Sequence, residues 1–244
     1  MKHIARLFGI IALAAIIGFL MTACDDGNGE DIGSDINNGS GALGATLNLS
    51  GQVYTWFDWG DIGGFEIFTG NLGVHSDGFG GTGSVTNGQL NFSIGRPARL
   101  FSILYLFQEM EAEGLNNFRF NPAEAQCAML GLLTIPDGSI GRGNAVLNSI
   151  TANGRSDTMH LGSYIYVDRD VNFSADLTQS NYHDRYYTVN AFNINLKAGW
   201  NALYGEETRI IEYTEAGTIL NYIITYSTAS PGGLRWVFQD WSDW

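Results

Sequence analysis

The dipeptide Asn87-Gly88 is the strongest local indication of secondary structure in this chain. It separates the short run 83–86 from the run 89–94, in which Leu90, Phe92 and Ile94 alternate with polar residues. Asn-Gly between two alternating runs is typical of a two-residue hairpin with a type I′ turn, because both turn residues need a positive φ. The pattern therefore predicts two antiparallel strands with one buried face.

Similar runs recur along the chain and predict about eleven short strands in all. Outside the hairpin they cover 46–56, 65–68, 125–135, 159–167, 171–175, 186–196, 200–204, 208–213, 219–226 and 234–238. Turn residues lie between them at 136–138, 153–154 and 215–217. Many short strands separated by turns are typical of a mainly β domain, and we expect an antiparallel β-sandwich of the Ig-like or Greek-key type.

One segment departs from the period of two. Between residues 97 and 113 the apolar residues recur at helical spacing, with Pro97 suited to the first helical position and Gly114 to the C-cap. This spacing predicts one amphipathic helix of about four turns, since an α-helix has 3.6 residues per turn.

The N-terminus has the pattern of a secretory signal peptide. Lys2, His3 and Arg6 precede an uncharged apolar run over residues 7–21, which is shorter than the roughly 20 residues of a spanning helix. An uncleaved membrane anchor is the alternative interpretation. A signal peptide that ends near residue 23 places the mature chain outside the cytoplasm.

The end of this run, Leu20-Met21-Thr22-Ala23-Cys24, resembles the lipobox of bacterial lipoproteins. The resemblance implies cleavage between Ala23 and Cys24 and attachment of lipid, palmitate included, to Cys24. Met21 departs from the commoner leucine, as in relaxed spirochaete lipoboxes. The segments 164–171 and 196–201 also resemble uncharacterised spirochaete lipoproteins. The family implies a lipid-anchored protein of the bacterial cell envelope, and we expect the outer membrane. An ordinary secreted cysteine is the alternative for Cys24.

Composition divides the rest of the chain into a tether and one domain. Residues 24–45 are rich in glycine, asparagine, serine and acids, with little to bury, and predict a flexible acidic tether. Residues 46–244 are expected to form a single β domain. If Cys24 carries lipid, Cys127 is the only other thiol; it lies in an apolar stretch and is expected to be buried and inert.

The charge balance excludes some partners. The whole chain has a net charge of −13, and removal of Lys2 and Arg6 makes it about −15. A chain this acidic is repelled by nucleic acid phosphates and by anionic lipid surfaces, so no nucleic acid partner is expected. The membrane is therefore expected as a partner only through the lipid anchor.

No common catalytic pattern is present. The sequence lacks a Gly-x-Ser-x-Gly elbow, a His-Glu-x-x-His helix and a phosphate-binding loop. His75 is close to Asp77, His160 to Asp157 and His183 to Asp184, but nothing in this spacing brings three or four metal ligands together. We therefore expect no enzyme activity, no metal and no cofactor.

Tryptophans give the remaining functional indication. Trp56 and Trp59 lie at the end of a predicted strand, where the chain enters a Gly/Asp-rich loop, and Trp241 and Trp244 lie among acidic residues at the C-terminus. Exposed tryptophans can stack on sugar rings or anchor a protein partner, although burial in the core is the alternative. The sequence thus predicts a structural or interaction role, toward another envelope protein, with a carbohydrate-binding surface module as the second hypothesis.

Overall fold

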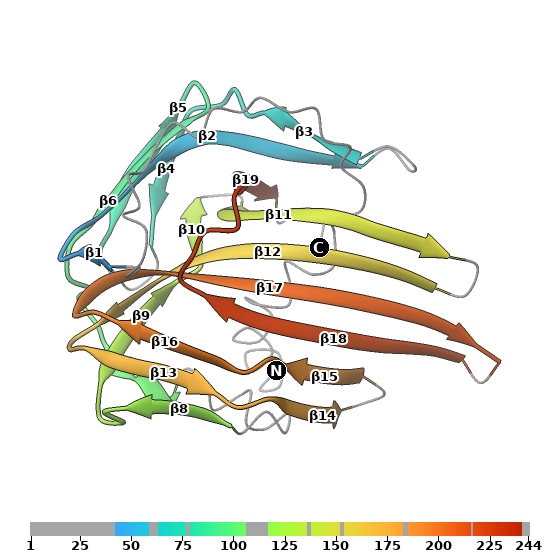
Figure 1. Ribbon diagram of the computed structural model, residues 1–244. Helices are drawn as coiled ribbons and strands as arrows, with labels where there is room; N and C mark the ends of the chain where they lie inside the picture. Colours follow the sequence, from blue (N-terminus) through green and yellow to red (C-terminus); the bar gives the residue numbers. More distant parts are fainter. Residues whose placement is uncertain are drawn as a thin grey trace, which may run out of the picture.

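The mainly β class is confirmed. The computed structural model describes residues 42–58, 63–76, 79–105, 117–135, 138–151, 154–182, 185–215 and 217–240, and it assigns 19 strands to them. Figure 1 shows two regions, a strongly curved upper part and a sheet of long strands below it.

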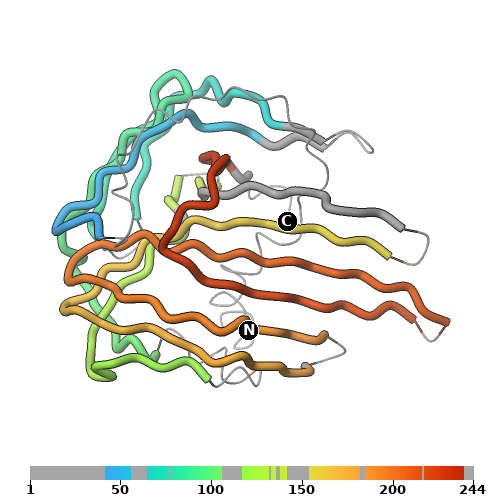
Figure 2. Tube along the Cα trace, viewed as in Figure 1, coloured from blue at the N-terminus to red at the C-terminus, as the bar shows by residue number. Residues whose placement is uncertain are grey.

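Seven strands of the upper region close into a barrel. In spatial order they are β10 (Leu132–Ile135), β4 (Leu72–His75), β5 (Thr82–Thr86), β6 (Gln89–Ile94), β2 (Leu47–Asp58), β19 (Arg235–Asp240) and β11 (Gly138–Thr151). The ring closes because β10 pairs with strands on both sides, Thr134 with His75 of β4 and Leu132 with Gly141 of β11. Strands from the two ends of the described chain, β2 and β19, run parallel side by side (Figure 2).

The Asn87-Gly88 hairpin is confirmed within this barrel. Asn87 and Gly88 have φ values of 49° and 77°, as a type I′ turn requires. Leu90, Phe92 and Ile94 of β6 are each at most 3% exposed and point into the barrel core. The alternation in the sequence therefore identifies the buried face correctly.

A long sheet continues from β11 below the barrel. Its further strands are β12 (Gly154–Val167), β17 (Gly199–Thr214), β18 (Gly217–Ser227), β15 (Arg185–Val189) and β14 (Thr178–Tyr182). Thr214 pairs with Gly217, which confirms the hairpin expected at 215–217. The runs 200–204 and 208–213 are one continuous strand, whereas 186–196 is divided between β15 and β16 (Phe192–Leu196).

Three strands form a separate small sheet, and four short strands border the large one. The small sheet has the order β16, β13 (Val171–Ala175) and β8 (Phe118–Asn121). The remaining strands are β1 (Ala42–Gly44), β3 (Gly63–Ile67), β7 (Phe101–Ser102) and β9 (Gln126–Leu130). Because β1 pairs with β17, residues 42–44 belong to the folded domain, although the sequence predicted them as part of the tether.

Strands β12 and β17 separate two hydrophobic cores. Tyr164 of β12 and Trp200 of β17 belong to the barrel core, while Ile165 and Leu203 of the same two strands belong to a second core with the small sheet. Successive side chains of a strand point to opposite faces, so a strand with a core on each face is buried at every position. This explains why residues 199–204 are all buried.

The finer architectural predictions differ from the structure. The sandwich is not confirmed: the described strands form a barrel, a long sheet and a small sheet, because β10 closes the ring. The helix over 97–113 is not supported, since residues 97–102 are not helical and Phe101 pairs with Cys127 of β9. Residues 103–105 are helical, and 106–113 lie outside the described residues. Across the described residues, we find no helix long and apolar enough to cross a membrane.

Candidate functional site

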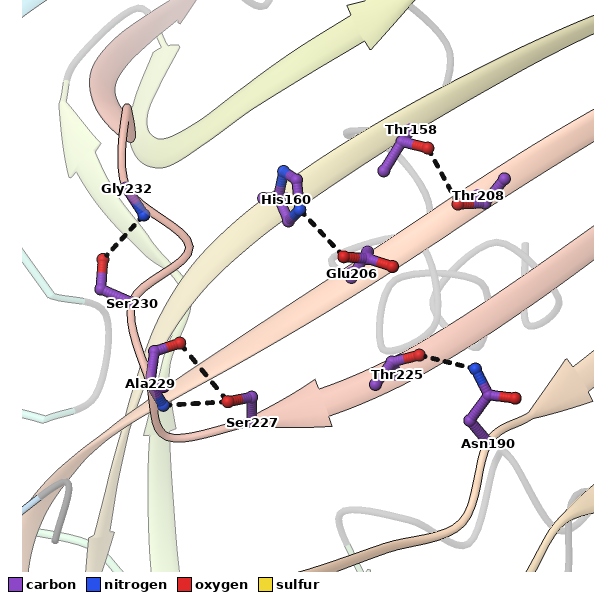
Figure 3. A network of polar contacts seen from close by, with 10 residues as sticks. All are labelled: Thr158, His160, Asn190, Glu206, Thr208, Thr225, Ser227, Ala229, Ser230 and Gly232. Carbon is purple, nitrogen blue, oxygen red and sulfur yellow. Dashed lines mark hydrogen bonds and ion pairs between the residues drawn. The ribbon is translucent and has the colours of Figure 1, made fainter. Parts of the chain in front are cut away.

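The distal part of the long sheet has a polar face. Thr158 and His160 of β12, Glu206 and Thr208 of β17, Thr225 of β18 and Asn190 point to the same side (Figure 3). We call this set the polar face. It lies on the side of the sheet that, farther along the same strands, contributes Tyr164 and Trp200 to the barrel core.

Hydrogen bonds between neighbouring strands order this face. His160 Nε2 lies 3.0 Å from Glu206 Oε2, and the hydroxyls of Thr158 and Thr208 lie 2.9 Å apart. Asn190 Nδ2 donates to Thr225 Oγ1 at 2.9 Å. The Glu206 side chain is 49% exposed. The face therefore presents fixed donors and acceptors to solvent, the chemistry that suits a polar partner.

The opposite face of the same strands has a different chemistry. Asp157 of β12 is 8% exposed and accepts hydrogen bonds from two arginines, Arg155 Nε at 2.7 Å and Arg209 Nη2 at 2.9 Å. Glu207 lies two residues from Arg209 on β17 and shares this face. We call Arg155, Asp157, Glu207 and Arg209 the charged cluster.

Burial changes the acidity of the groups around this cluster. Desolvation raises the pKa of Glu207 to about 7, and the positive charge of Arg209 opposes this rise only in part. Burial, together with the charge of Glu207, also raises the pKa of the Tyr226 hydroxyl above its usual value. Glu207 is thus largely a neutral acid below neutral pH and can donate a hydrogen bond.

Most of the residues predicted as functional lie outside the part of the chain that the structure describes. Ala23, Cys24, Trp59, Trp241 and Trp244 are outside the described residues. So is the side chain of Trp56, whose backbone pairs with Phe65 in the β2–β3 ladder. The predicted tryptophan site and the predicted lipid attachment at Cys24 therefore stay predictions.

Two other tryptophans are buried as core residues. Trp200 is fully buried and its Nε1 donates to Gly95 O at 2.9 Å. Trp236 stacks on Tyr164, with 6.3 Å between ring centroids, and its Nε1 donates to Ser50 O at 3.1 Å. Each indole has its polar group satisfied within the protein, and neither offers a ring for a ligand to stack on.

The closeness of His160 to Asp157 in the sequence does not predict the hydrogen-bond partner of His160. His160 and Asp157 are three residues apart on a strand, so they lie on opposite faces, and their partners are Glu206 and Arg209 respectively. His75 ends β4, while Asp77, His183 and Asp184 lie outside the described residues. Within the described ranges, no three histidine, cysteine or acidic side chains group closely enough to hold a metal ion.

Cys127 is fully buried, as predicted. It belongs to the second core, and burial, with a smaller effect of Asp168, raises its pKa to about 12. A thiolate is the reactive form of cysteine, so this thiol is inert at physiological pH.

Sequence reasoning did not single out the polar face or the charged cluster. Both depend on which residue of β12 lies opposite which residue of β17, and this register is set by long-range pairing. The one available signal was the charged run 206–209 next to an alternating strand. Comparison with protein families, curated proteins and solved structures gave no match to this chain.

Proposed function

We propose that this chain is a lipid-anchored protein of the bacterial cell envelope whose β domain has an interaction role. The resemblance of residues 20–24 to a lipobox supports the anchor at Cys24, with the outer membrane as the expected location. The glycine-rich and acidic segment that follows would let the domain stand away from the bilayer.

The observation that carries the interaction role is the polar face. Side chains on a solvent-exposed sheet face can hydrogen-bond to water and do not need to bond to one another. Here, however, side chains of neighbouring strands are held in place by hydrogen bonds to each other. Side chains fixed before binding lose little conformational entropy when a partner arrives. We therefore assign the partner surface to the polar face, and we propose another envelope protein as the partner.

Site-specific photo-crosslinking in intact cells tests the interaction role. A photoreactive amino acid at Thr225, on the polar face, is compared with one at Asn91, an exposed residue of β6 on the barrel. We expect a discrete crosslinked species from position 225 and none from position 91. Equal crosslinking at the two positions, or none at position 225, would contradict the assignment.

Glycan binding is the second candidate function, and one observation favours it. Tyr186 of β15 is 44% exposed and lies opposite Asn221 on the same face as the hydrogen-bonded network. An exposed aromatic ring beside amide and hydroxyl groups suits a sugar, which needs stacking and hydrogen bonds together. Calorimetric titration with soluble glycans should show binding that Tyr186→Ala removes and Tyr186→Phe retains. No heat with any glycan would exclude this function.

A further inference from the structure

The outer wall of the barrel carries a block of uncharged polar side chains. In β5, β6 and β2, residues that point into the barrel core alternate with residues that point outward (Figure 1). We call the outward set the neutral wall. Its nine members are Thr82, Ser84 and Thr86 of β5, Gln89, Asn91 and Ser93 of β6, and Asn48, Ser50 and Gln52 of β2. All are exposed except Gln52, which is partly buried.

The strand register arranges the neutral wall in three rows that cross the three strands. The rows are Thr82, Ser93 and Asn48; then Ser84, Asn91 and Ser50; and last Thr86, Gln89 and Gln52. Neighbouring rows are about 7 Å apart and neighbouring strands about 5 Å apart, as in any antiparallel sheet. A ligand with repeating hydrogen-bonding groups can therefore meet several members of the wall at once.

The absence of charge distinguishes this wall from an ordinary protein surface. The chain has 12 basic and 25 acidic side chains. Charged residues make up roughly 25–35% of a well-designed soluble surface, so a block of this size would ordinarily hold about two or three of them. The neutral wall holds none. It therefore offers no local electrostatic attraction to a charged ligand, which favours an uncharged one.

Hydrogen bonds link side chains in each outer row and leave the central row open. Ser93 Oγ donates to Asn48 Oδ1 at 2.8 Å in one outer row, and Gln89 Nε2 donates to Gln52 Oε1 at 2.6 Å in the other. Within the described chain, the three side chains of the central row are bonded to no other protein group. Hydroxyl and amide groups both donate and accept hydrogen bonds, so the central row offers both functions to a ligand.

The chemistry of the wall fits a sugar better than a protein. Binding energy at protein interfaces comes mostly from a few aromatic or arginine anchors. Of the large apolar side chains that are exposed in the described part of the chain, none lies on the wall. Sugar hydroxyls donate and accept hydrogen bonds as the wall residues do. The repeats of a polysaccharide would also let several weak contacts act together.

We propose that the neutral wall binds an uncharged polysaccharide chain that crosses the barrel along the central row. Ser84, Asn91 and Ser50 exchange hydrogen bonds with hydroxyl groups of consecutive sugars. Gly73 of β4 extends this row, because it lies opposite Ser84 and a Cβ there would meet no atom within 4 Å. The site lies on the outside of the barrel and does not depend on the polar face or on Tyr186. A polysaccharide of mixed length gives no discrete crosslinked species at Asn91, which agrees with the expected crosslinking result.

Affinity electrophoresis of the full chain in non-ionic detergent tests the proposal. The gels contain hydroxyethyl cellulose, galactomannan or dextran as uncharged polymers, or alginate as an anionic one. The first variant removes the polar groups of the central row by combining Ser50→Ala, Ser84→Ala and Asn91→Ala. These substitutions leave the net charge unchanged, so the mobility without polymer should equal that of the parent chain.

Two further variants complete the test. The matched control combines Ser174→Ala, Asn193→Ala and Asn195→Ala on the outer face of the small sheet, which lies away from the wall. Gly73→Ile keeps every member of the wall and adds an uncharged apolar side chain beside Ser84. It tests the site even if the triple variant of the central row loses its fold, which melting temperatures would show.

We expect at least one uncharged polymer to slow the parent chain, and alginate to leave its mobility unaffected. The triple variant of the central row should bind that polymer about tenfold more weakly, because several hydrogen bonds are lost together. Gly73→Ile should also weaken binding, whereas the small-sheet control should match the parent chain. The proposal would be overturned by no retardation in any uncharged polymer, or by equal retardation of a folded wall variant and the parent chain. Loss of retardation in Tyr186→Ala would also overturn it, since the sugar would then lie on the polar face.

Discussion

Asp157 and Arg209 face each other across the β12–β17 ladder, and Asp157 Oδ2 accepts a hydrogen bond from Arg209 Nη2 at 2.9 Å. The other oxygen of the same carboxylate accepts from Arg155 at 2.7 Å. One buried carboxylate therefore holds both arginines of the charged cluster.

Removal of the Asp157 charge should destabilise the fold strongly. Asp157→Asn leaves two partly buried guanidinium groups without a countercharge, and breaking a buried ion pair in this way typically costs about 3–5 kcal/mol. Asp176→Asn is the control, because Asp176 pairs with Arg119 where both side chains are about two-thirds exposed. The free energy of unfolding in urea should fall by about 3 kcal/mol for Asp157→Asn and by less than about 1 for Asp176→Asn. Equal losses would contradict the buried role of Asp157.

Stability should depend on pH through Glu207. Its pKa is about 7 in the folded chain against 4.5 for an ordinary glutamate, so the unfolded chain loses this proton first as pH rises. The contribution of Glu207 is therefore neutral below about pH 4.5 and becomes destabilising between pH 4.5 and 7, by an amount on the order of 3 kcal/mol. Glu207→Gln does not titrate. The free energy of unfolding of this variant, measured in urea relative to the parent chain, should increase over this pH range. If the difference between the two free energies is constant with pH, that would be evidence against the burial of Glu207.

The tight turn at Gly88 should tolerate no side chain. A Cβ at this position would lie 2.0 Å from Phe68 O, whereas a Cβ at Gly80 would meet no atom within 4 Å. Both glycines have a positive φ, 77° and 85°, so the backbone strain of an alanine is similar at the two sites. Thermal unfolding should show a loss of about 1 kcal/mol for Gly80→Ala and a clearly larger one for Gly88→Ala. Similar losses would mean that the Phe68 carbonyl moves aside without cost.

Cys127 should not react in the native protein. Its raised pKa and full burial leave almost no accessible thiolate at pH 8. A disulfide reagent should therefore modify it only after denaturant is added, at a rate set by opening of the second core. Rapid modification without denaturant would show that this core opens easily.

The sequence predicted local features well and their assembly poorly. The Asn87-Gly88 turn and the buried face of β6 follow from neighbouring residues, because turn chemistry and alternation act within a few positions. The closure of the barrel depends on the pairing of Thr134 with His75, which are distant in the chain. Strand β7 replaces the predicted start of a helix for the same reason, since Phe101 finds a partner in β9.

The candidate site was missed because it depends on register. His160 and Asp157 are close in sequence, but the pleat of β12 sends them to opposite faces, and their partners come from β17 some 50 positions later. Asp157 and Arg209 come together only when β12 and β17 are paired. No local pattern contains this information.

The intact mass of the protein, extracted from membranes with detergent, tests whether Cys24 carries the proposed lipid anchor. We expect a chain that begins at Cys24, lacks residues 1–23 and carries the added mass of attached acyl chains. The Cys24→Ala variant should carry no added acyl mass and should incorporate no palmitate in labelled cells. A parent chain that begins at another residue, or one that begins at Cys24 with no added mass, would show that Cys24 is not the lipid anchor.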